Sequence, residues 1–155
     1  MTLRALELKV PPVAVFLLCA AGAWGVRRAA PGLQLALPWI SAIAMPLALF
    51  GLAVGILGVI QFLRVGTTVH PTHPSRANRV VRSGLYGLSR NPMYLGLALV
   101  LAAIAAWLAH PLSFLVVPAF VTYMTRFQIV PEERALREKF GEPYAEYVRS
   151  VRRWI

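Results

Sequence analysis

The chain has 155 residues, of which 58% are hydrophobic and 14% are charged, and its mean hydropathy is +0.63. A soluble domain would carry about a quarter charged residues. Here the charges gather in residues 64–92 and 126–153, and long stretches between them carry none. This pattern excludes an ordinary soluble domain and predicts an all-α integral membrane protein with one domain over residues 1–155.

The formal net charge is +10, from sixteen Lys and Arg against six acidic residues. Such an excess of basic residues is typical of proteins that bind nucleic acid, but no nucleic-acid-binding motif accompanies it. Basic residues are expected in cytoplasmic loops and beside anionic lipid headgroups. We therefore expect membrane lipids as partners and no nucleic acid.

The first apolar run covers about residues 11–26 and ends before Arg27 and Arg28. Arg4 and Lys9 precede it, which is also typical of a signal peptide. Pro11-Pro12 is a plausible helix start, and the remaining chain would still span the membrane several times. We expect a first membrane helix here.

The second apolar run covers residues 38–63, long enough to cross a bilayer with tilt. It contains Gly51, Gly55 and Gly58, and small residues at this spacing let helices approach closely. The sequence favours packing within the chain over dimerisation, and it leaves the oligomeric state open.

The third and fourth runs cover residues 92–109 and 112–130, and His110-Pro111 between them predicts a tight helical hairpin. Four spans place the N-terminus, the loop 64–92 and the C-terminal tail on one side, with fourteen Lys and Arg against two on the other. The positive-inside rule puts the fourteen in the cytoplasm. We expect a multi-pass protein of the bacterial inner membrane with both termini cytoplasmic.

The tail 131–155 carries apolar residues at spacings of three and four, which predict an amphipathic helix; they are Leu136, Phe140, Tyr144, Tyr147, Val151 and Trp154. Gly141 and Pro143 should divide it into two helical pieces. The pair would lie on the membrane surface or fold over the loop 66–92 as a lid.

The segment Arg90-Asn91-Pro92 has two explanations. Asn is a good helix N-cap and Pro is favoured at the first helical position. However, a cation beside a helix N-terminus is unfavourable, so Arg90 also indicates a site for a carboxylate or phosphate.

The pair Glu132-Glu133 likewise has two explanations. Glutamates in a first helical turn complement the helix dipole after Pro131. Two carboxylates at a membrane boundary could also bind a cation or a ribose diol, and Arg126 could pair with one of them.

Several other site classes are disfavoured. His70 and His73 lie three apart, but the intervening prolines and the lack of Asp argue against a metal site. The chain has no G-x-G-x-x-G motif after a strand, no P-loop lysine motif and no serine nucleophile elbow.

Residues 78–96 read NRVVRSGLYGLSRNPMYLG and residues 132–147 read EERALREKFGEPYAEY. They resemble the patterns H-x-L-V-x-x-G-x-Y-x-x-x-R-H-P-x-Y-x-G and E-E-x-x-L-x-x-x-F-G-x-x-Y-x-x-Y of the isoprenylcysteine carboxyl methyltransferase and phospholipid methyltransferase superfamily. The two motifs occur in order around the hairpin, within residues 66–154.

The resemblance implies an integral membrane methyltransferase that binds S-adenosyl-L-methionine between the loop 66–92 and the tail. By position, Arg90, Asn91 and Tyr94 would contact its methionine end. From its charge, either Arg90 or Arg126 could hold a carboxylate. Val80, Val81, Gly84 and Tyr86 would line the nucleoside, and Glu132 and Glu133 would close the site. The implied cofactor-binding set is Asn78, Val80, Val81, Gly84, Tyr86, Arg90, Asn91, Tyr94, Arg126, Glu132 and Glu133, and the implied catalytic set is Arg90, Asn91, Tyr94 and Glu133.

Two positions depart from the family pattern, because the histidines of the motif are Asn78 and Asn91 here. Asn forms hydrogen bonds but cannot act as a general base near neutral pH. This mildly favours an acceptor that is already a nucleophile, such as a carboxylate, or a thiol.

The sequence thus predicts methyl transfer to a lipophilic or prenylated acceptor that arrives from the bilayer. Two alternatives stay open: an NADPH-dependent membrane reductase of the sterol-reductase type, and a non-enzymatic protein whose basic loop binds anionic lipid.

Overall fold

The computed structural model describes residues 7–35, 37–64 and 80–155. Over these ranges every regular element is helical, which confirms the all-α prediction. The α-helices are α1 (Pro12–Ala29), α2 (Pro38–Ala42), α3 (Ala44–Arg64), α4 (Pro92–Leu108), α5 (Val116–Met124), α6 (Val130–Phe140) and α7 (Glu142–Ser150). The short turns are η2 (Pro31–Leu33), η4 (Gly84–Gly87), η5 (Pro111–Leu115) and the π-helical η6 (Thr125–Ile129).

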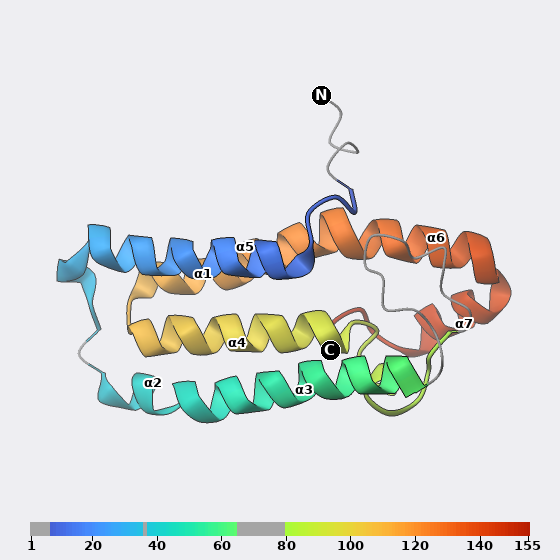
Figure 1. The fold of residues 1–155 in the computed structure, drawn as a ribbon, viewed down its shortest axis with the longest axis horizontal. Coiled ribbons are helices and arrows are strands. Elements are labelled where there is room, and N and C mark those ends of the chain that lie inside the picture. The colour runs from blue at the N-terminus through green and yellow to red at the C-terminus, as the bar shows by residue number, and fades with distance from the viewer. Residues whose placement is uncertain (1–6, 36, 65–79) are drawn as a thin grey trace.

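Helix α4 occupies the middle of the bundle. It contacts α3 on one side and α1 and α5 on the other, and the four helices run side by side (Figure 1). The start of α1, the end of α3, the start of α4 and helix α6 all lie at the same end of the molecule (Figure 1). Chain segments far apart in sequence therefore meet at that end.

Within the described ranges, three helical stretches are long and apolar enough to cross a membrane: Pro12–Ala29, Trp39–Arg64 and Pro111–Phe140. Helix α4 is also apolar, but it is shorter, with 17 residues. The second stretch is interrupted near Ile43, where α2 ends and α3 begins. The expected hairpin at His110-Pro111 is present, because α4 and α5 pack together across η5.

The fourth apolar helix differs from the prediction, because it does not end near Val130 but continues to Phe140. Pro131 has no N–H for a bond to the carbonyl four residues earlier. That carbonyl, on Phe127, instead accepts a hydrogen bond of 2.9 Å from the N–H of Leu8. The Val130 N–H bonds to Thr125, five residues back, so a π-helical turn carries the helix past the proline.

Glycines allow α3 and α4 to approach closely. A Cβ added at Gly96 would lie 2.6 Å from the backbone nitrogen of Gly55, and one added at Gly51 would lie 2.9 Å from the Cβ of Leu99. Both distances are below van der Waals contact. The prediction that the Gly51, Gly55 and Gly58 stripe packs within the chain is thereby confirmed.

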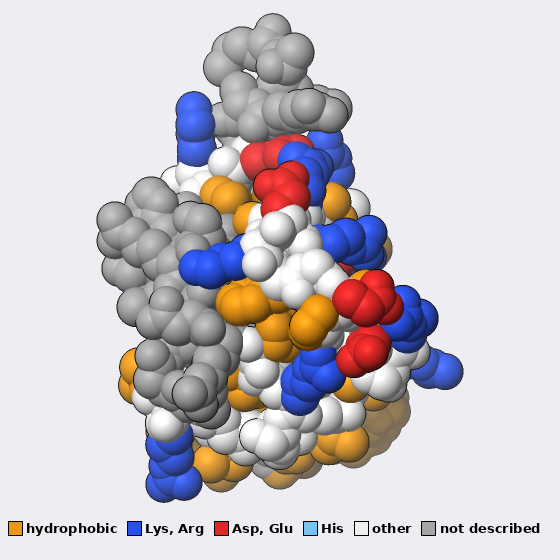
Figure 2. Space-filling model, turned by 90° about the vertical axis from the view of Figure 1, so that its right-hand side faces the viewer, with side chains coloured by type: hydrophobic (Ala, Val, Ile, Leu, Met, Phe, Trp, Pro, Cys, Tyr) orange, Lys and Arg blue, Asp and Glu red, His pale blue; other side chains and the backbone are white. Residues whose placement is uncertain are grey.

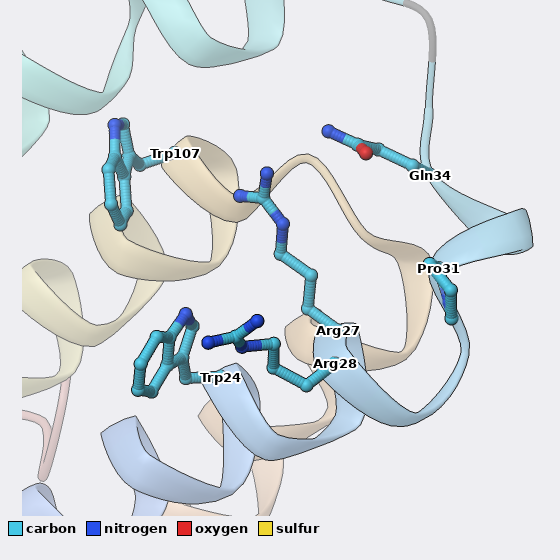
Figure 3. A pocket seen from close by; sticks show the side chains of 6 residues that line it. All are labelled: Trp24, Arg27, Arg28, Pro31, Gln34 and Trp107. Carbon is cyan, nitrogen blue, oxygen red and sulfur yellow. The ribbon is translucent and has the colours of Figure 1, made fainter.

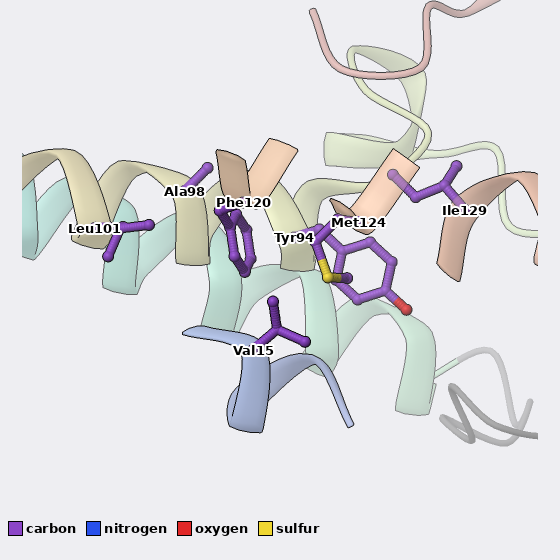
Figure 4. Packing of buried hydrophobic residues seen from close by; sticks show 7 residues of the cluster. All are labelled: Val15, Tyr94, Ala98, Leu101, Phe120, Met124 and Ile129. Carbon is purple, nitrogen blue, oxygen red and sulfur yellow. The ribbon is translucent and has the colours of Figure 1, made fainter. Parts of the chain in front are cut away.

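The main apolar core is formed by α1, α4, α5 and η6; it contains Val15, Tyr94, Ala98, Leu101, Phe120, Met124 and Ile129 (Figure 4). Trp154 returns to this core near the end of the chain and donates a hydrogen bond from Nε1 to Thr125 Oγ1 at 3.1 Å. Because Val15 of α1 belongs to this core, helix α1 is an integral part of the packed bundle.

Candidate functional site

The polar residues of both sequence motifs meet at the end of the bundle where α4 begins. Figure 2 looks onto this end and shows acidic and basic side chains gathered there beside hydrophobic ones. The site is built from residues 80–91, the first turn of α4, and helices α6 and α7. His70, His73 and Asn78 lie outside the described residues.

The segment before α4 is anchored on α3. Gly84 has a φ of +60°, and a Cβ there would collide with the side-chain amide of Gln61. The Oε1 of the same Gln61 accepts the Leu85 N–H at 3.0 Å. A glycine is therefore required both by the backbone angle and by the close approach.

The side chains of Tyr86 and Val81, which belong to this segment, are buried. The Tyr86 hydroxyl lies 3.4 Å from the Gly58 carbonyl, and its ring packs against Phe62. Burial raises the pKa of Tyr86 above its ordinary value. Val80 is half-buried, so two of the residues assigned to a nucleoside pocket are buried and a third is partly covered.

The Arg90 guanidinium connects this segment to the tail. Its Nη1 donates to the carbonyls of Val148 at 3.0 Å and Val151 at 2.6 Å, and its Nη2 donates to Glu133 Oε1 at 2.8 Å. The side chain is 8% exposed. The basic charge expected beside the start of α4 is therefore neutralised within the chain by Glu133.

Glu133 is shared between two arginines. Besides the contact with Arg90, it accepts bonds from Arg153 Nε at 2.9 Å and Nη2 at 2.8 Å. These bonds raise the pKa of Arg153 above its ordinary value. Arg153 was not singled out from the sequence, because nothing distinguishes it there from neighbouring basic residues.

Asn91 stands at the N-terminal boundary of α4, but its side chain does not cap the helix. Its Nδ2 instead donates to the Arg153 carbonyl at 2.9 Å, and the Arg90 N–H donates to the Arg152 carbonyl at 3.0 Å. The capping explanation thus does not hold for the Asn91 side chain. The residue fixes the final turn of the tail against the start of α4.

Tyr94 and Glu132 form a second polar pair. The Tyr94 hydroxyl donates to Glu132 Oε1 at 2.6 Å, from a ring that is itself buried in the core. Unlike Glu133, Glu132 has no ion pair with any described cation. It is therefore the carboxyl group of this site with capacity for a cationic ligand.

Helix α7 lies over residues 81–91, which corresponds to the lid arrangement considered from the sequence. The Tyr147 hydroxyl donates to the Tyr86 carbonyl at 2.7 Å, and Arg82 donates to the Pro143 carbonyl. Tyr144 and Tyr147 are both buried. Burial raises the pKa of Tyr147 to about 12 and raises that of Tyr144 as well. The apolar stripe of the tail is the sequence signal for these contacts.

Arg126 is not paired with Glu132 or Glu133. It bonds to Glu7 Oε1 at 2.8 Å, and Arg134 bonds to the other oxygen of Glu7 at 3.3 Å. The bond from Arg126, with the nearby charge of Arg134, lowers the pKa of Glu7. The pairing joins the start of the chain to the fourth helix, and the sequence contained no signal for it.

S-adenosylmethionine has a cationic sulfonium as its reactive centre, flanked by an amino acid and a nucleoside. Arg90 Nε is buried without a partner, and Glu132 has no cation. One unused donor and one unpaired carboxyl group near buried aromatic rings fit such a molecule. Among the described residues no cluster of three or more His, Cys, Asp or Glu could hold a metal ion.

Comparison with known proteins gives an independent result. The family model for phospholipid methyltransferase matches residues 39–143, which contain helices α3 to α6 and the segment before α4. A 63-residue uncharacterized protein of Haemophilus influenzae is 44% identical over its whole length, which corresponds to 41% of this chain. No solved structure matches the chain.

Two plant relatives are also similar. A probable protein-S-isoprenylcysteine O-methyltransferase of Oryza sativa subsp. indica is 29% identical, and protein-S-isoprenylcysteine O-methyltransferase B of Arabidopsis thaliana is 27% identical. Each match covers 73% of this chain but only 59% and 57% of the respective plant protein. The family model matches more than half of the chain, and this confirms the superfamily resemblance found in the two motifs. The chain belongs to the phospholipid methyltransferase family.

Proposed function

We propose that the chain transfers a methyl group from S-adenosyl-L-methionine to a lipophilic acceptor at the cytoplasmic face of a membrane. Family membership supports methyl transfer rather than NADPH-dependent reduction. The polar site at the end of an apolar bundle supports a reaction between a water-soluble donor and a membrane-dissolved acceptor.

The observation that carries the proposal is the junction between the two motif segments. Arg90, just before α4, bonds to Glu133 of α6, and Tyr94 in the first turn of α4 bonds to Glu132. The two adjacent glutamates are thus both held at the N-terminal end of α4. Glu133 is neutralised by arginine, whereas Glu132 pairs with no described cation. If the two glutamates only complemented the helix dipole, they would not need to differ in this way.

We assign different roles to these residues. Arg90, Glu133 and Asn91 position the tail, because their contacts lie within the chain. Glu132 and Tyr94 would face the bound donor, since an opposite charge nearby favours an ionised carboxyl group. Among the remaining assigned residues, Val80, Val81, Gly84 and Tyr86 would line the nucleoside; Arg126 is engaged with Glu7 and leaves the assigned set.

S-adenosylmethionine supplies an electrophilic methyl group, so the protein has to align the acceptor and exclude water. The buried rings of Tyr86, Tyr94 and Tyr144 serve exclusion, and the α7 helix covers the segment before α4. The plant relatives are named for O-methylation of isoprenylcysteine. We propose an acceptor of the same kind here, an isoprenylcysteine-like carboxylate, with a lipid or thiol as further possibilities.

We further propose that α4 crosses the membrane together with the three longer helices. Its 17 residues give about 25 Å, short of the roughly 30 Å of hydrocarbon, and its central position lets neighbouring helices cover its ends. Four crossings place both termini with the site. The count of basic residues then puts this side in the cytoplasm, at the bacterial inner membrane.

The proposal is tested with membranes that contain the protein, incubated with tritiated-methyl S-adenosylmethionine and extracted into organic solvent. We expect label in the extract only when the protein is present. NADPH oxidation is measured in parallel. NADPH consumption without methyl incorporation would indicate a reductase. If neither activity is detected, the non-enzymatic lipid-binding alternative is favoured.

A further inference from the structure

A pocket of about 540 Å³ lies at the end of the bundle opposite the candidate site. It is formed where α1 and α4 end and the chain turns through η2. Its lining residues are Trp24, Arg27, Arg28, Pro31, Gln34 and Trp107 (Figure 3). Figure 3 shows the Arg27 side chain extending between Trp107 and Gln34, and the Arg28 side chain beside the Trp24 ring. None of these residues belongs to the methyl-transfer site.

The two arginines of the pocket have no carboxylate to neutralise them. The chain contains no Asp, and its six glutamates are Glu7, Glu132, Glu133, Glu138, Glu142 and Glu146. All of these glutamates lie at the other end, on α6 and α7 or against them, and the C-terminal carboxylate lies near the start of α4 (Figure 1). The residues that the structure does not describe contain no acidic side chain. An anion for Arg27 and Arg28 must therefore come from outside the chain.

The tryptophans place the pocket at the membrane surface. Trp24 and Trp107 are 53% and 62% exposed, and each lies in one of the final turns of an apolar helix. Exposed Trp rings at helix ends are typical of the headgroup level of a bilayer. Arg28 follows Trp24 by one turn, about 6 Å further along the helix, and its guanidinium lies 5.1 Å from the Trp24 ring centroid.

The C-terminal turn of a helix favours cations, so the dipole of α1 explains a basic residue there. It does not explain why two arginines and two indole rings line one pocket. Guanidinium groups bind phosphate through several hydrogen bonds, and indole rings contact the glycerol and upper acyl region of a lipid. Both requirements are met at the depth where lipid phosphates lie.

We propose that this pocket binds the phosphate group of a membrane phospholipid, in the leaflet opposite the candidate methyl-transfer site. Arg27 and Arg28 supply the charge, and Trp24 and Trp107 flank the glycerol end of the lipid. The proposal concerns a different surface from the methyl-transfer site and does not depend on that activity. The same phosphate chemistry could be offered by free phosphate, so the experiment has an arm for each source.

The test is native mass spectrometry of the detergent-purified chain, titrated with phosphatidylglycerol and, separately, with inorganic phosphate. The variant Arg27→Gln/Arg28→Gln should bind the first phosphatidylglycerol about 30-fold more weakly, or roughly fivefold for each arginine removed. The variant Arg27→Lys/Arg28→Lys keeps the charge and should retain most of the binding. It also shows that the pocket tolerates substitution.

The matched control is Arg137→Gln/Arg149→Gln, which removes two exposed charges at the other end. It should change the affinity by less than about twofold. Equal lipid retention by the wild type and Arg27→Gln/Arg28→Gln would overturn the proposal. Inorganic phosphate binding as tightly as the lipid would overturn the assignment to a phospholipid and identify a soluble phosphate as the occupant.

Discussion

The Arg90 guanidinium and the Glu133 carboxylate form an ion pair of 2.8 Å with side chains only 8% and 14% exposed. The pair joins the start of α4 to the first turn of α6. Arg90 also donates hydrogen bonds to the Val148 and Val151 carbonyls, and it thereby satisfies acceptors at the C-terminal end of α7. A single side chain therefore fixes the three elements that enclose the candidate site.

Replacing Arg90 with alanine should release the tail. The substitution removes the hydrogen bonds of a charged donor to Glu133 and to two tail carbonyls, and such bonds contribute about 1.5–3 kcal/mol each; Arg153 still neutralises Glu133. The sequence alone predicts loss of cofactor binding from a folded protein, and the structure adds a loss of tail order. We expect undetectable methyl transfer and faster proteolysis within residues 141–155, measured by limited digestion and mass spectrometry.

Arg82 provides the control for Arg90, since it connects the same segment to α7 at the surface. Its contact with Glu146 is 3.7 Å long and both side chains are exposed. Exposed ion pairs contribute about 0–1 kcal/mol. Arg82→Ala should therefore keep the tail protected from protease, and equal digestion of both variants would contradict the role given to Arg90.

Glu132→Gln tests the carboxyl group assigned to the bound donor. The substitution keeps the size of the side chain and a hydrogen bond with Tyr94, but removes the negative charge. We expect S-adenosylmethionine affinity to fall by about 10- to 100-fold, the range for a hydrogen bond to a charged group, and the affinity for S-adenosylhomocysteine, which lacks the sulfonium charge, to fall less. Calorimetry on the detergent-purified chain measures it, with the exposed Glu138→Gln on the same helix as control. Equal affinities would remove Glu132 from the site.

Gly96→Ala tests the close approach of α3 and α4. The new methyl group would meet backbone atoms of Gly55, which cannot move as a flexible side chain would. Overpacking of this kind costs about 1–3 kcal/mol, and we expect a lower unfolding temperature in detergent. Gly25 in α1 has open space around its Cβ position, so Gly25→Ala should leave stability unchanged or raise it by about 0.4–1 kcal/mol.

Glu7 should make the stability of the protein depend on acid pH. The bond from Arg126 lowers the folded-state pKa of Glu7 below its ordinary value of 4.5. The contribution of Glu7 is therefore complete above pH 4.5 and is lost as the pH falls through the folded-state pKa. We expect the stability difference between the wild type and Glu7→Gln to shrink as the pH is lowered below 4.5, as followed by thermal unfolding. A difference that stays constant would contradict the pairing.

The helical runs could be predicted because bilayer-length apolar segments and glycine spacing are local properties of the sequence. The break at Gly141 and Pro143 followed from the same local chemistry. The continuation of the fourth helix through Pro131 could not be predicted. It depends on Leu8, which is far away in sequence and donates a backbone hydrogen bond to the Phe127 carbonyl.

The site was predictable as a set of segments but not as a set of contacts. The two motifs correctly brought Arg90, Tyr94 and the two glutamates together. Which arginine pairs with which glutamate depends on the paths of the two ends of the chain. The last residues place Arg153 beside Glu133, and the first described residues place Glu7 beside Arg126. Charge type alone does not distinguish these arginines in the sequence.

Mass spectrometry of lipid extracts and small acceptors from bacterial cells with and without the protein tests methyl transfer most directly. Cells that produce the Glu132→Gln variant serve as the matched control. We expect one or more lipophilic compounds to gain a single methyl group only with the wild-type protein. Extracts that are identical across all three cell lines, from a protein that is folded in the membrane and supplied with S-adenosylmethionine, would contradict it.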